Sequence, residues 1–248
     1  MHMTETPAVR FYFSFRSPFA AIAFYRLRRS PLFKDVKFEL IPLWPENIFG
    51  GHMDNPTDSL FKMAYIFSDA ARQAEEAGLP SAQFKAIAEQ FKLPAGMDYS
   101  KEKAGLEMPE EPWRITHLAF LHAQDKGKGW AFADAVFSRR FNFDGKGSKN
   151  VMDPAVLGEI ADELGLDVAE TVNAHTSGRF DDDHREMIRQ GEADGVFGVP
   201  FFVIEQAEGN EFFWGNDRLP FLHKAITNAE VLPVINADSL REVQTSRC

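Results

Sequence analysis

Val9–Arg29, with the sequence VRFYFSFRSPFAAIAFYRLRR, decides the fold, because two different spacings of apolar residues follow one another within it. Val9–Phe15 is a short run rich in aromatic residues, which is typical of a buried strand. Ala20–Arg29 carries apolar residues at helical spacing. Between them, Ser17 is a favoured N-cap residue and Pro18 suits the first position of a helix. The stretch therefore predicts a strand, a tight turn and a helix that begins beside Ser17.

A second strand is predicted soon after this helix, over Val36–Leu43 (VKFELIPL). The strand–helix–strand unit spans about 35 residues, which is the length expected where a helix crosses over to join two parallel strands. The chain therefore opens with a βαβ unit.

The C-terminal part of the sequence predicts a hairpin and a last helix. Phe201–Ile204 and Glu211–Phe213 are apolar and are separated by a polar turn that contains glycine. Asn216 or Asp217 is a suitable N-cap for a helix that runs to Asn228. This order gives a ββα unit.

The middle of the chain carries helical periodicity almost throughout. The two outer units together give the βαβ…ββα order of a thioredoxin fold, of the α/β class, with a large all-helical domain inserted into it. We expect residues 9–45 and 195–228 to form the thioredoxin-like domain, residues 46–194 the insertion and residues 229–248 a tail. The helices predicted in the insertion are Ser59–Ala77, Ser81–Phe91, Pro112–Asp125, Trp130–Asn142, Pro154–Leu164, Asp167–Thr176 and Phe180–Glu192.

Composition narrows the function classes. The 248 residues are 44% hydrophobic and carry a formal net charge of −10, which argues against an electrostatic nucleic-acid footprint. No apolar run approaches the roughly 18 residues of a membrane span, and no secretory signal is recognisable, so a cytoplasmic protein is expected. The single cysteine, Cys248, excludes a CxxC redox centre, and the histidines show no metal-ligand spacing, so no metal site is predicted.

Three stretches carry a resemblance to a known family: FYFSFRSPFAAIAFYRL, GVFGVPFFVI and FFWGNDRLPFL. Over roughly Val9 to Lys224, the chain resembles the DsbA-like thioredoxin superfamily, and within it the 2-hydroxychromene-2-carboxylate isomerase and kappa-class glutathione transferase family. The resemblance implies glutathione as cofactor, a homodimer, and Ser17 as the catalytic residue. Ser17 and Ala20 stand at the two cysteine positions of the DsbA-like oxidoreductases, so dithiol chemistry is excluded at this place.

The implied role of Ser17 is to donate a hydrogen bond to the glutathione sulfur and to favour its thiolate. A thiol has a pKa near 8.5, so only a minority is ionised at neutral pH. A hydroxyl donor and the N–H groups of a helix N-terminus both favour the anion. The residue types at Ser17 and Pro18 fit that chemistry.

The resemblance also implies residues that hold glutathione. Val199-Pro200 matches the family's cis-proline element, whose backbone pairs with the cysteinyl residue of glutathione; alternatively, Pro200 simply begins a strand. Asn216 and Asp217 match residues that hold the γ-glutamyl end, although Asp217 could serve only as an N-cap. Two further candidates are Asn55, which would bond the peptide, and Lys62, which would pair with a carboxylate or lie on a solvated helix face.

A substrate pocket is expected beside Ser17. Arg16 could favour a thiolate, attract an acidic substrate or pair with a surface carboxylate. The family's asparagine is missing before Arg114, and Ser14 replaces a strand-end aspartate, so the particular substrate stays open. The residues expected to line the pocket are Arg16, Phe19, Trp44, Trp113 and Arg114, with Phe49 and Tyr65 as further aromatic candidates. Each of the aromatic residues could instead belong to the core, because large aromatic side chains dominate protein cores.

These features together predict a glutathione-dependent isomerase of an aromatic or unsaturated carboxylic acid. In that reaction the thiolate adds to an electrophilic carbon, a bond rotates, and the thiolate leaves, so glutathione is regenerated. One alternative is a kappa-class-like glutathione S-transferase, which keeps the conjugate. Another is a non-catalytic thioredoxin-like module that binds thiols or peptides beside Val199-Pro200.

Overall fold

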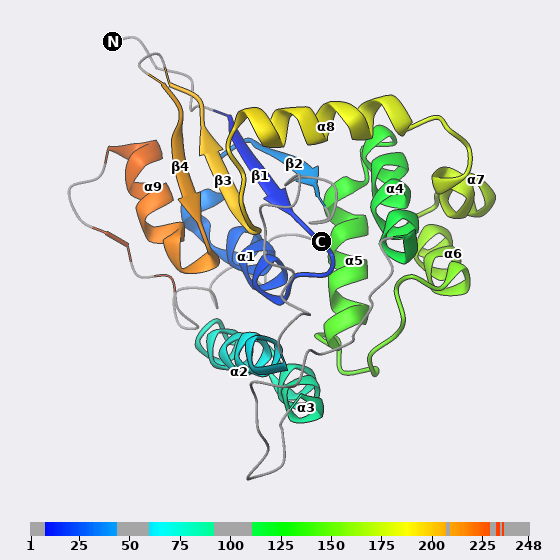
Figure 1. Ribbon diagram of the computed structural model, residues 1–248, viewed down its shortest axis with the longest axis horizontal. Coiled ribbons are helices and arrows are strands. Elements are labelled where there is room, and N and C mark those ends of the chain that lie inside the picture. The colour runs from blue at the N-terminus through cyan, green and yellow to red at the C-terminus, as the bar shows by residue number, and fades with distance from the viewer. Residues whose placement is uncertain are drawn as a thin grey trace.

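A four-stranded mixed sheet in the order β2-β1-β3-β4 forms the centre of the molecule (Figure 1). The computed structural model describes residues 8–43, 60–91, 111–206, 209–228, 232–233 and 235. β1 (Val9–Phe13) pairs in parallel with β2 (Phe38–Pro42) and antiparallel with β3 (Phe201–Ile204). β4 (Glu211–Trp214) pairs antiparallel with β3. The predicted βαβ and ββα units therefore meet in one sheet.

The helices lie where the periodicity predicts them, to within one or two residues. One difference concerns residues 167–176, where a short α-helix is followed by a 3-10 turn. The helices are α1 (Pro18–Arg29), α2 (Leu60–Glu76), α3 (Ala82–Gln90), α4 (Glu111–Asp125), α5 (Gly129–Phe141), α6 (Pro154–Glu163), α7 (Val168–Val172), α8 (Asp181–Ala193) and α9 (Leu219–Thr227), with 3-10 turns at Pro31–Phe33, Asn173–His175 and Asn216–Arg218.

The start of α1 follows the local chemistry expected from the sequence. Ser17 is the N-cap, and its Oγ accepts a hydrogen bond from the Ala20 N–H at 3.1 Å. Pro18 occupies the first helical turn, where its missing N–H costs nothing. Three arginines stand in the last turn, where cations interact favourably with the helix dipole.

The two faces of the sheet pack against different partners, because side chains alternate along each strand. On one face, Phe11 stacks on Phe202 with ring centroids 4.9 Å apart, and Phe13 meets Phe120 of α4 edge-on at 5.3 Å. The other face packs beneath α8 and the segment that follows it. Its buried cluster consists of Tyr12, Ile41, Leu43, Val196, Phe201 and Val203, with Met187 and Val199 against it.

The larger buried cluster runs without a break from the sheet into the helical segment. Phe15, in the loop between β1 and α1, contacts Phe137 of α5 with ring centroids 5.0 Å apart. Phe24 of α1 contacts the same Phe137 ring at 5.4 Å. Aromatic pairs of this kind contribute about 0.5–1.5 kcal/mol each beyond the area they bury. The β1–α1 loop is therefore fixed against α5, while the division into two domains stays a prediction.

A buried carboxylate ties α8 to the sheet. Asp194, 7% exposed at the end of α8, accepts two hydrogen bonds from Arg10 at 2.8 and 2.9 Å and one from the Tyr12 hydroxyl at 2.5 Å. Burial and this hydrogen bond raise the pKa of Tyr12, which stays a neutral donor. A fourth hydrogen bond to Asp194 comes from Asn210, in the β3–β4 turn, at 3.2 Å. The network anchors the segment that leads from α8 to Pro200.

Candidate functional site

Ser17 and Val199 lie side by side at the end of β1. The Ser17 hydroxyl donates a hydrogen bond to the Val199 carbonyl oxygen at 3.3 Å. The antiparallel register that pairs Tyr12 with Phe201 brings the end of β1 and the start of β3 to the same edge of the sheet (Figure 1). The Val199–Pro200 peptide bond is cis, and the Pro200 carbonyl accepts the Gly215 N–H at 3.0 Å.

The backbone at this junction offers groups that an extended ligand can pair with. In the part of the chain that the structure describes, the Val199 N–H donates to no acceptor. Ser17 is partly exposed at the N-terminus of α1, a helix of twelve residues, where the dipole favours an anion. Phe19, in the first turn of α1, is half-buried beside it. The junction can therefore hold an extended backbone next to a hydroxyl donor and a positive helix end.

His117 of α4 supports the β1–α1 loop from behind, which the sequence did not predict. Its Nε2 lies 3.3 Å from the Phe15 N–H and 3.3 Å from Ser14 Oγ, and its Nδ1 lies 2.8 Å from the Trp113 carbonyl. Since the Phe15 N–H can only donate, Nε2 is the acceptor and Nδ1 carries the proton. Burial lowers the pKa of His117 to about 3. A neutral imidazole therefore holds the loop in place.

Asn216 points into the protein rather than capping a helix. It is 1% exposed, and its Nδ2 donates to Gln73 Oε1 of α2 at 2.7 Å. Its Oδ1 is buried and has no hydrogen-bond partner among the described residues. The predicted side-chain cap is wrong: Gly215, with φ of 106°, is the N-cap of the 3-10 turn, and no side chain bonds there. Asn216 therefore joins the last turn to α2.

Of the other predicted glutathione ligands, Asp217 and Lys62 are exposed, and Asn55 lies outside the described residues. Asp217 is exposed, with its carboxylate 3.4 Å from the Arg218 guanidinium. Lys62 is exposed in the first turn of α2, the helix that carries Gln73. Asn55 and Trp44 lie outside the described residues, as do the further candidate Phe49 and the terminal Cys248. Tyr65, the other further candidate, is 63% exposed on α2.

Trp113 is buried, which agrees with the alternative that it belongs to the core. It is 1% exposed, and the guanidinium of Arg140 lies over its ring at 4.4 Å from the centroid. Arg140, in the last turn of α5, also donates to the Arg16 carbonyl at 3.5 Å. Burial and the nearby charge of Arg16 lower the pKa of Arg140 to about 9. Arg140, which the sequence did not single out, thus brings a cation from α5 to the loop beside Ser17.

Arg114 lies on another side of α4 from Trp113. Its guanidinium pairs with Asp181 of α8 at 2.6 Å and donates to the His175 carbonyl at 3.4 Å. One residue of a helix is turned about 100° from the next, so Arg114 faces α8 while Trp113 and His117 face the loop. Its described contacts fix α4 to α8.

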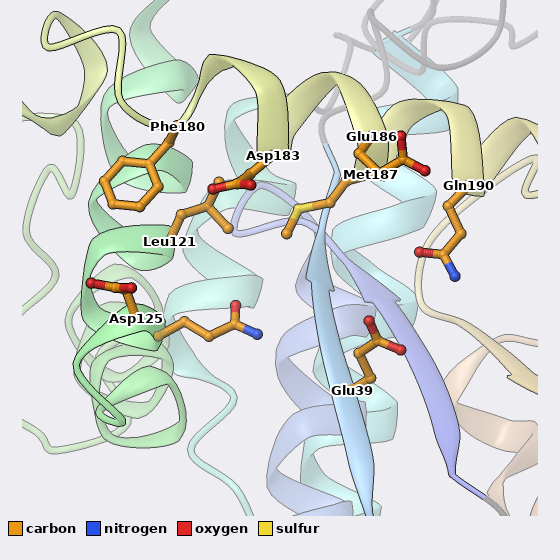
Figure 2. A pocket seen from close by; sticks show the side chains of 9 residues that line it. Glu39, Leu121, Asp125, Phe180, Asp183, Glu186, Met187 and Gln190 are labelled. Carbon is orange, nitrogen blue, oxygen red and sulfur yellow. The ribbon is translucent and has the colours of Figure 1, made fainter.

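A separate surface cavity of about 340 Å³ opens between β2, α4 and α8 (Figure 2). None of the predicted site residues lines it. It lies beside Glu39, near the amino end of β2, whereas Ser17 follows the carboxyl end of β1. The cavity is therefore distinct from the Ser17–Val199 junction. Its lining residues are Glu39, Leu121, Gln124, Asp125, Phe180, Asp183, Glu186, Met187 and Gln190.

The described residues contain neither a metal-binding cluster nor a membrane-spanning helix. No group of three or more histidine, cysteine, aspartate or glutamate side chains among them is arranged to hold a metal ion. No helix in the same ranges has the length and apolar character needed to cross a bilayer.

The fold and the Ser17–Val199 junction agree with the family that the sequence matches. Residues 8–227 match the model of the DSBA-like thioredoxin domain, so the chain belongs to that family. Among its relatives, it is 28% identical over 228 residues to a 2-hydroxychromene-2-carboxylate isomerase of Pseudomonas sp. (strain C18), covering 90% of this chain and 92% of that one. The protein of the same name from Pseudomonas putida is 27% identical over 225 residues, covering 88% and 93%. A third, from Sphingobium xenophagum, is 28% identical over 109 residues, which is 43% of this chain and 50% of that one.

Solved structures of similar fold include enzymes of two kinds. A 2-hydroxychromene-2-carboxylate isomerase superposes with a TM-score of 0.64 at 22% identity, covering 89% of this chain and 95% of that one. The cytosolic disulfide reductase DsbM of Pseudomonas aeruginosa, in a structure with GSH, superposes with a TM-score of 0.57 at 16% identity, covering 89% and 97%. At these identities the likeness shows the DsbA-like thioredoxin fold alone.

Proposed function

We propose that this protein is a glutathione-dependent isomerase of an aromatic or unsaturated carboxylic acid. The observation that carries the proposal is the position of Ser17, whose hydroxyl stands at the N-terminus of α1, 3.3 Å from the carbonyl of the cis Val199–Pro200 peptide. The relatives named as 2-hydroxychromene-2-carboxylate isomerases support the reaction class.

The chemistry divides between the cofactor and the chain. Glutathione supplies a thiol whose anion can add reversibly to an electrophilic carbon. Ser17 turns its hydroxyl hydrogen from the Val199 carbonyl toward the sulfur, and the N-terminus of α1 adds a favourable electrostatic field. A pKa lowered by one to two units corresponds to about 1.4–2.7 kcal/mol, which a hydroxyl donor and a helix end can provide together.

The residues around Ser17 and Val199 suit the other groups of glutathione, which is a tripeptide. The Val199 N–H and carbonyl suit the backbone of the cysteinyl residue, in the manner of an added strand. Asn216 is 1% exposed and bonds Gln73, so its part in the proposal is to hold the turn that carries Asp217. Asp217 suits the ammonium group, while Lys62 and Asn55 suit the remaining carboxylate and peptide.

The residues at the two DsbA-type cysteine positions disfavour disulfide reduction, which is the activity named for DsbM. Ser17 and Ala20 carry no sulfur, and the only cysteine of the sequence is Cys248. Thiol–disulfide exchange needs an attacking thiolate in the protein, so these positions cannot perform it. The cytoplasmic location and the homodimer expected from the resemblance stay predictions.

Calorimetric titration with glutathione tests the proposal on the wild type and on Ser17→Ala. We expect micromolar to millimolar binding, together with a thiolate absorbance near 240 nm that is weaker in the variant at the same pH. Absence of binding to the folded wild type would refute the proposal. In a subsequent substrate assay, a constant glutathione concentration supports isomerisation, whereas consumption of one glutathione for each product supports the transferase.

A further inference from the structure

Arg140 occupies a position that its packing alone does not explain. It stands in the last turn of α5, with its guanidinium 4.4 Å from the Trp113 ring centroid and 5.0 Å from that of Phe141. One Nη atom donates to the Arg16 carbonyl at 3.5 Å. The two aromatic rings fix the orientation of the guanidinium. The Arg16 carbonyl accepts from one of the five N–H groups of Arg140.

No carboxylate neutralises Arg140 within the described ranges. The preceding residue makes the contrast clear, since Arg139 pairs with Glu163 at 2.5 Å. The Nε of Arg140 is buried and has no hydrogen-bond partner there. Arg140 is partly exposed as a residue, so an anion can reach its guanidinium. Leaving a partly buried cation without an anionic partner has a free-energy cost, and a methionine would pack over Trp113 without that cost. The arrangement is thus suited to receive an anion.

The location of Arg140 indicates which anion it could bind. The Arg16 carbonyl belongs to the peptide bond that leads into Ser17, so a group bound to Arg140 lies close to the reacting position. Arg140 approaches from α5, whereas Asn216 and Gln73 approach from the other side of α1, near α9 and α2 (Figure 1). Of the described residues expected to hold the γ-glutamyl end of glutathione, Asn216 therefore lies on that other side.

We propose that Arg140 binds the carboxylate of the organic acid substrate and so selects acids over neutral analogues. This inference rests on the proposed isomerase function and names the residue that recognises its substrate class. A guanidinium fork takes a carboxylate through two parallel N–H···O bonds, which fixes direction as well as charge. The unsaturated part of the acid then extends from Arg140 toward Ser17.

The test compares cinnamate with cinnamamide, which keeps the shape and lacks the charge. Each is titrated calorimetrically into protein saturated with glutathione, using the wild type, Arg140→Gln, Arg140→Met and the control Arg139→Gln. We expect the wild type and Arg139→Gln to bind cinnamate about 10- to 100-fold more tightly than cinnamamide. Both Arg140 variants lose this preference while keeping their affinity for glutathione. The methionine variant retains the packing over Trp113 and guards against a folding defect.

Two results would overturn the proposal. One is a cinnamate preference that survives in a folded Arg140 variant or is absent from the wild type. The other is a loss of glutathione affinity in the Arg140 variants, which would assign the guanidinium to a glutathione carboxylate instead. Failure of the wild type to bind glutathione would refute the isomerase proposal separately, and the cinnamate comparison on the protein alone would still test Arg140.

Discussion

The Ser17 hydroxyl lies 3.3 Å from the Val199 carbonyl oxygen, although 182 residues separate them in the chain. The contact exists because β1 ends in the Ser17 turn and β3 begins just after Val199, and the two strands are antiparallel neighbours. A hydroxyl, a helix N-terminus and a strand-like backbone edge therefore share one place.

The N-terminus of α1 is expected to lower the pKa of a thiol placed at Ser17. In Ser17→Cys, made in a Cys248→Ser background, we expect a thiol pKa well below 8.5, because the first turn of the helix favours the thiolate. The pH dependence of alkylation by iodoacetamide measures it. Glu192→Cys in the same background is the matched control, since Glu192 is exposed in the last turn of α8, where the dipole disfavours an anion. Equal pKa values for the two thiols would contradict the expectation.

His117 is expected to make the protein less stable in acid. Its native pKa of about 3 lies below the value of about 6.5 expected for an unfolded chain, so the unfolded state binds the proton more tightly. The contribution of His117 is therefore complete above pH 6.5 and is lost as the pH falls toward 3. The linkage slope for one such group approaches about 1.4 kcal/mol per pH unit.

Urea unfolding between pH 7 and 4 measures this effect. His117→Gln keeps a donor and an acceptor near Phe15, but the amide cannot reproduce all the hydrogen bonds of the imidazole. We therefore expect the free energy of unfolding at pH 7 to fall by about 1–3 kcal/mol. Because the titrating imidazole is gone, we also expect a shallower decline of stability in acid. The control is His175→Gln, which alters a partly exposed histidine whose Nδ1 lies 2.9 Å from the Val172 carbonyl. An unchanged pH slope in His117→Gln would show that other groups cause the decline.

The sequence predicts best the features that depend on near neighbours. The Ser17 cap and Pro18 lie within one turn of α1, and the structure confirms both. The approach of Val199 to Ser17 was predictable only through the family resemblance, because local spacing contains no information about strand pairing. The α/β class and the order of the elements followed from periodicity alone.

The sequence fails where the outcome depends on which side of a helix packs inward. Arg114 and Trp113 are adjacent, yet one pairs with Asp181 and the other lies beneath Arg140. His117 and Ser14 meet across 103 residues, and Arg140 and Arg16 across 124. No spacing rule links such pairs, because their contact follows from the packing of α4 and α5 against the β1–α1 loop.

Asp194 is expected to contribute much more to stability than the other acidic partner of Arg10. Asp194→Asn removes the charge from a site where both side chains are largely buried, so we expect a loss of about 3–5 kcal/mol. Glu205→Gln removes an exposed partner of the same guanidinium at 3.1 Å, and we expect a change of less than about 1 kcal/mol. Chemical denaturation of both variants at pH 7 measures the difference. Equal losses would contradict the role assigned to Asp194.

Gly198 is expected to be required because Trp214 lies directly against it. A Cβ atom at Gly198 would stand 2.7 Å from Trp214 Nε1, closer than real contacts allow. In Gly198→Ala we therefore expect a stability loss of about 1–3 kcal/mol, as in other overpacked sites, and a changed tryptophan emission. Since Val199 follows directly, we also expect a lower affinity for glutathione if the proposed function holds.

The double variant Gly198→Ala/Trp214→Ala decides whether this contact is the cause. Trp214 is 55% exposed and packs on Phe197 with ring centroids 4.8 Å apart, so its removal alone is expected to cost little. If the clash is responsible, the double variant regains the stability and glutathione affinity that Gly198→Ala loses, which gives a favourable coupling energy in the double-mutant cycle. Additive losses would show instead that alanine disturbs the backbone at Gly198 itself and that Trp214 is a bystander.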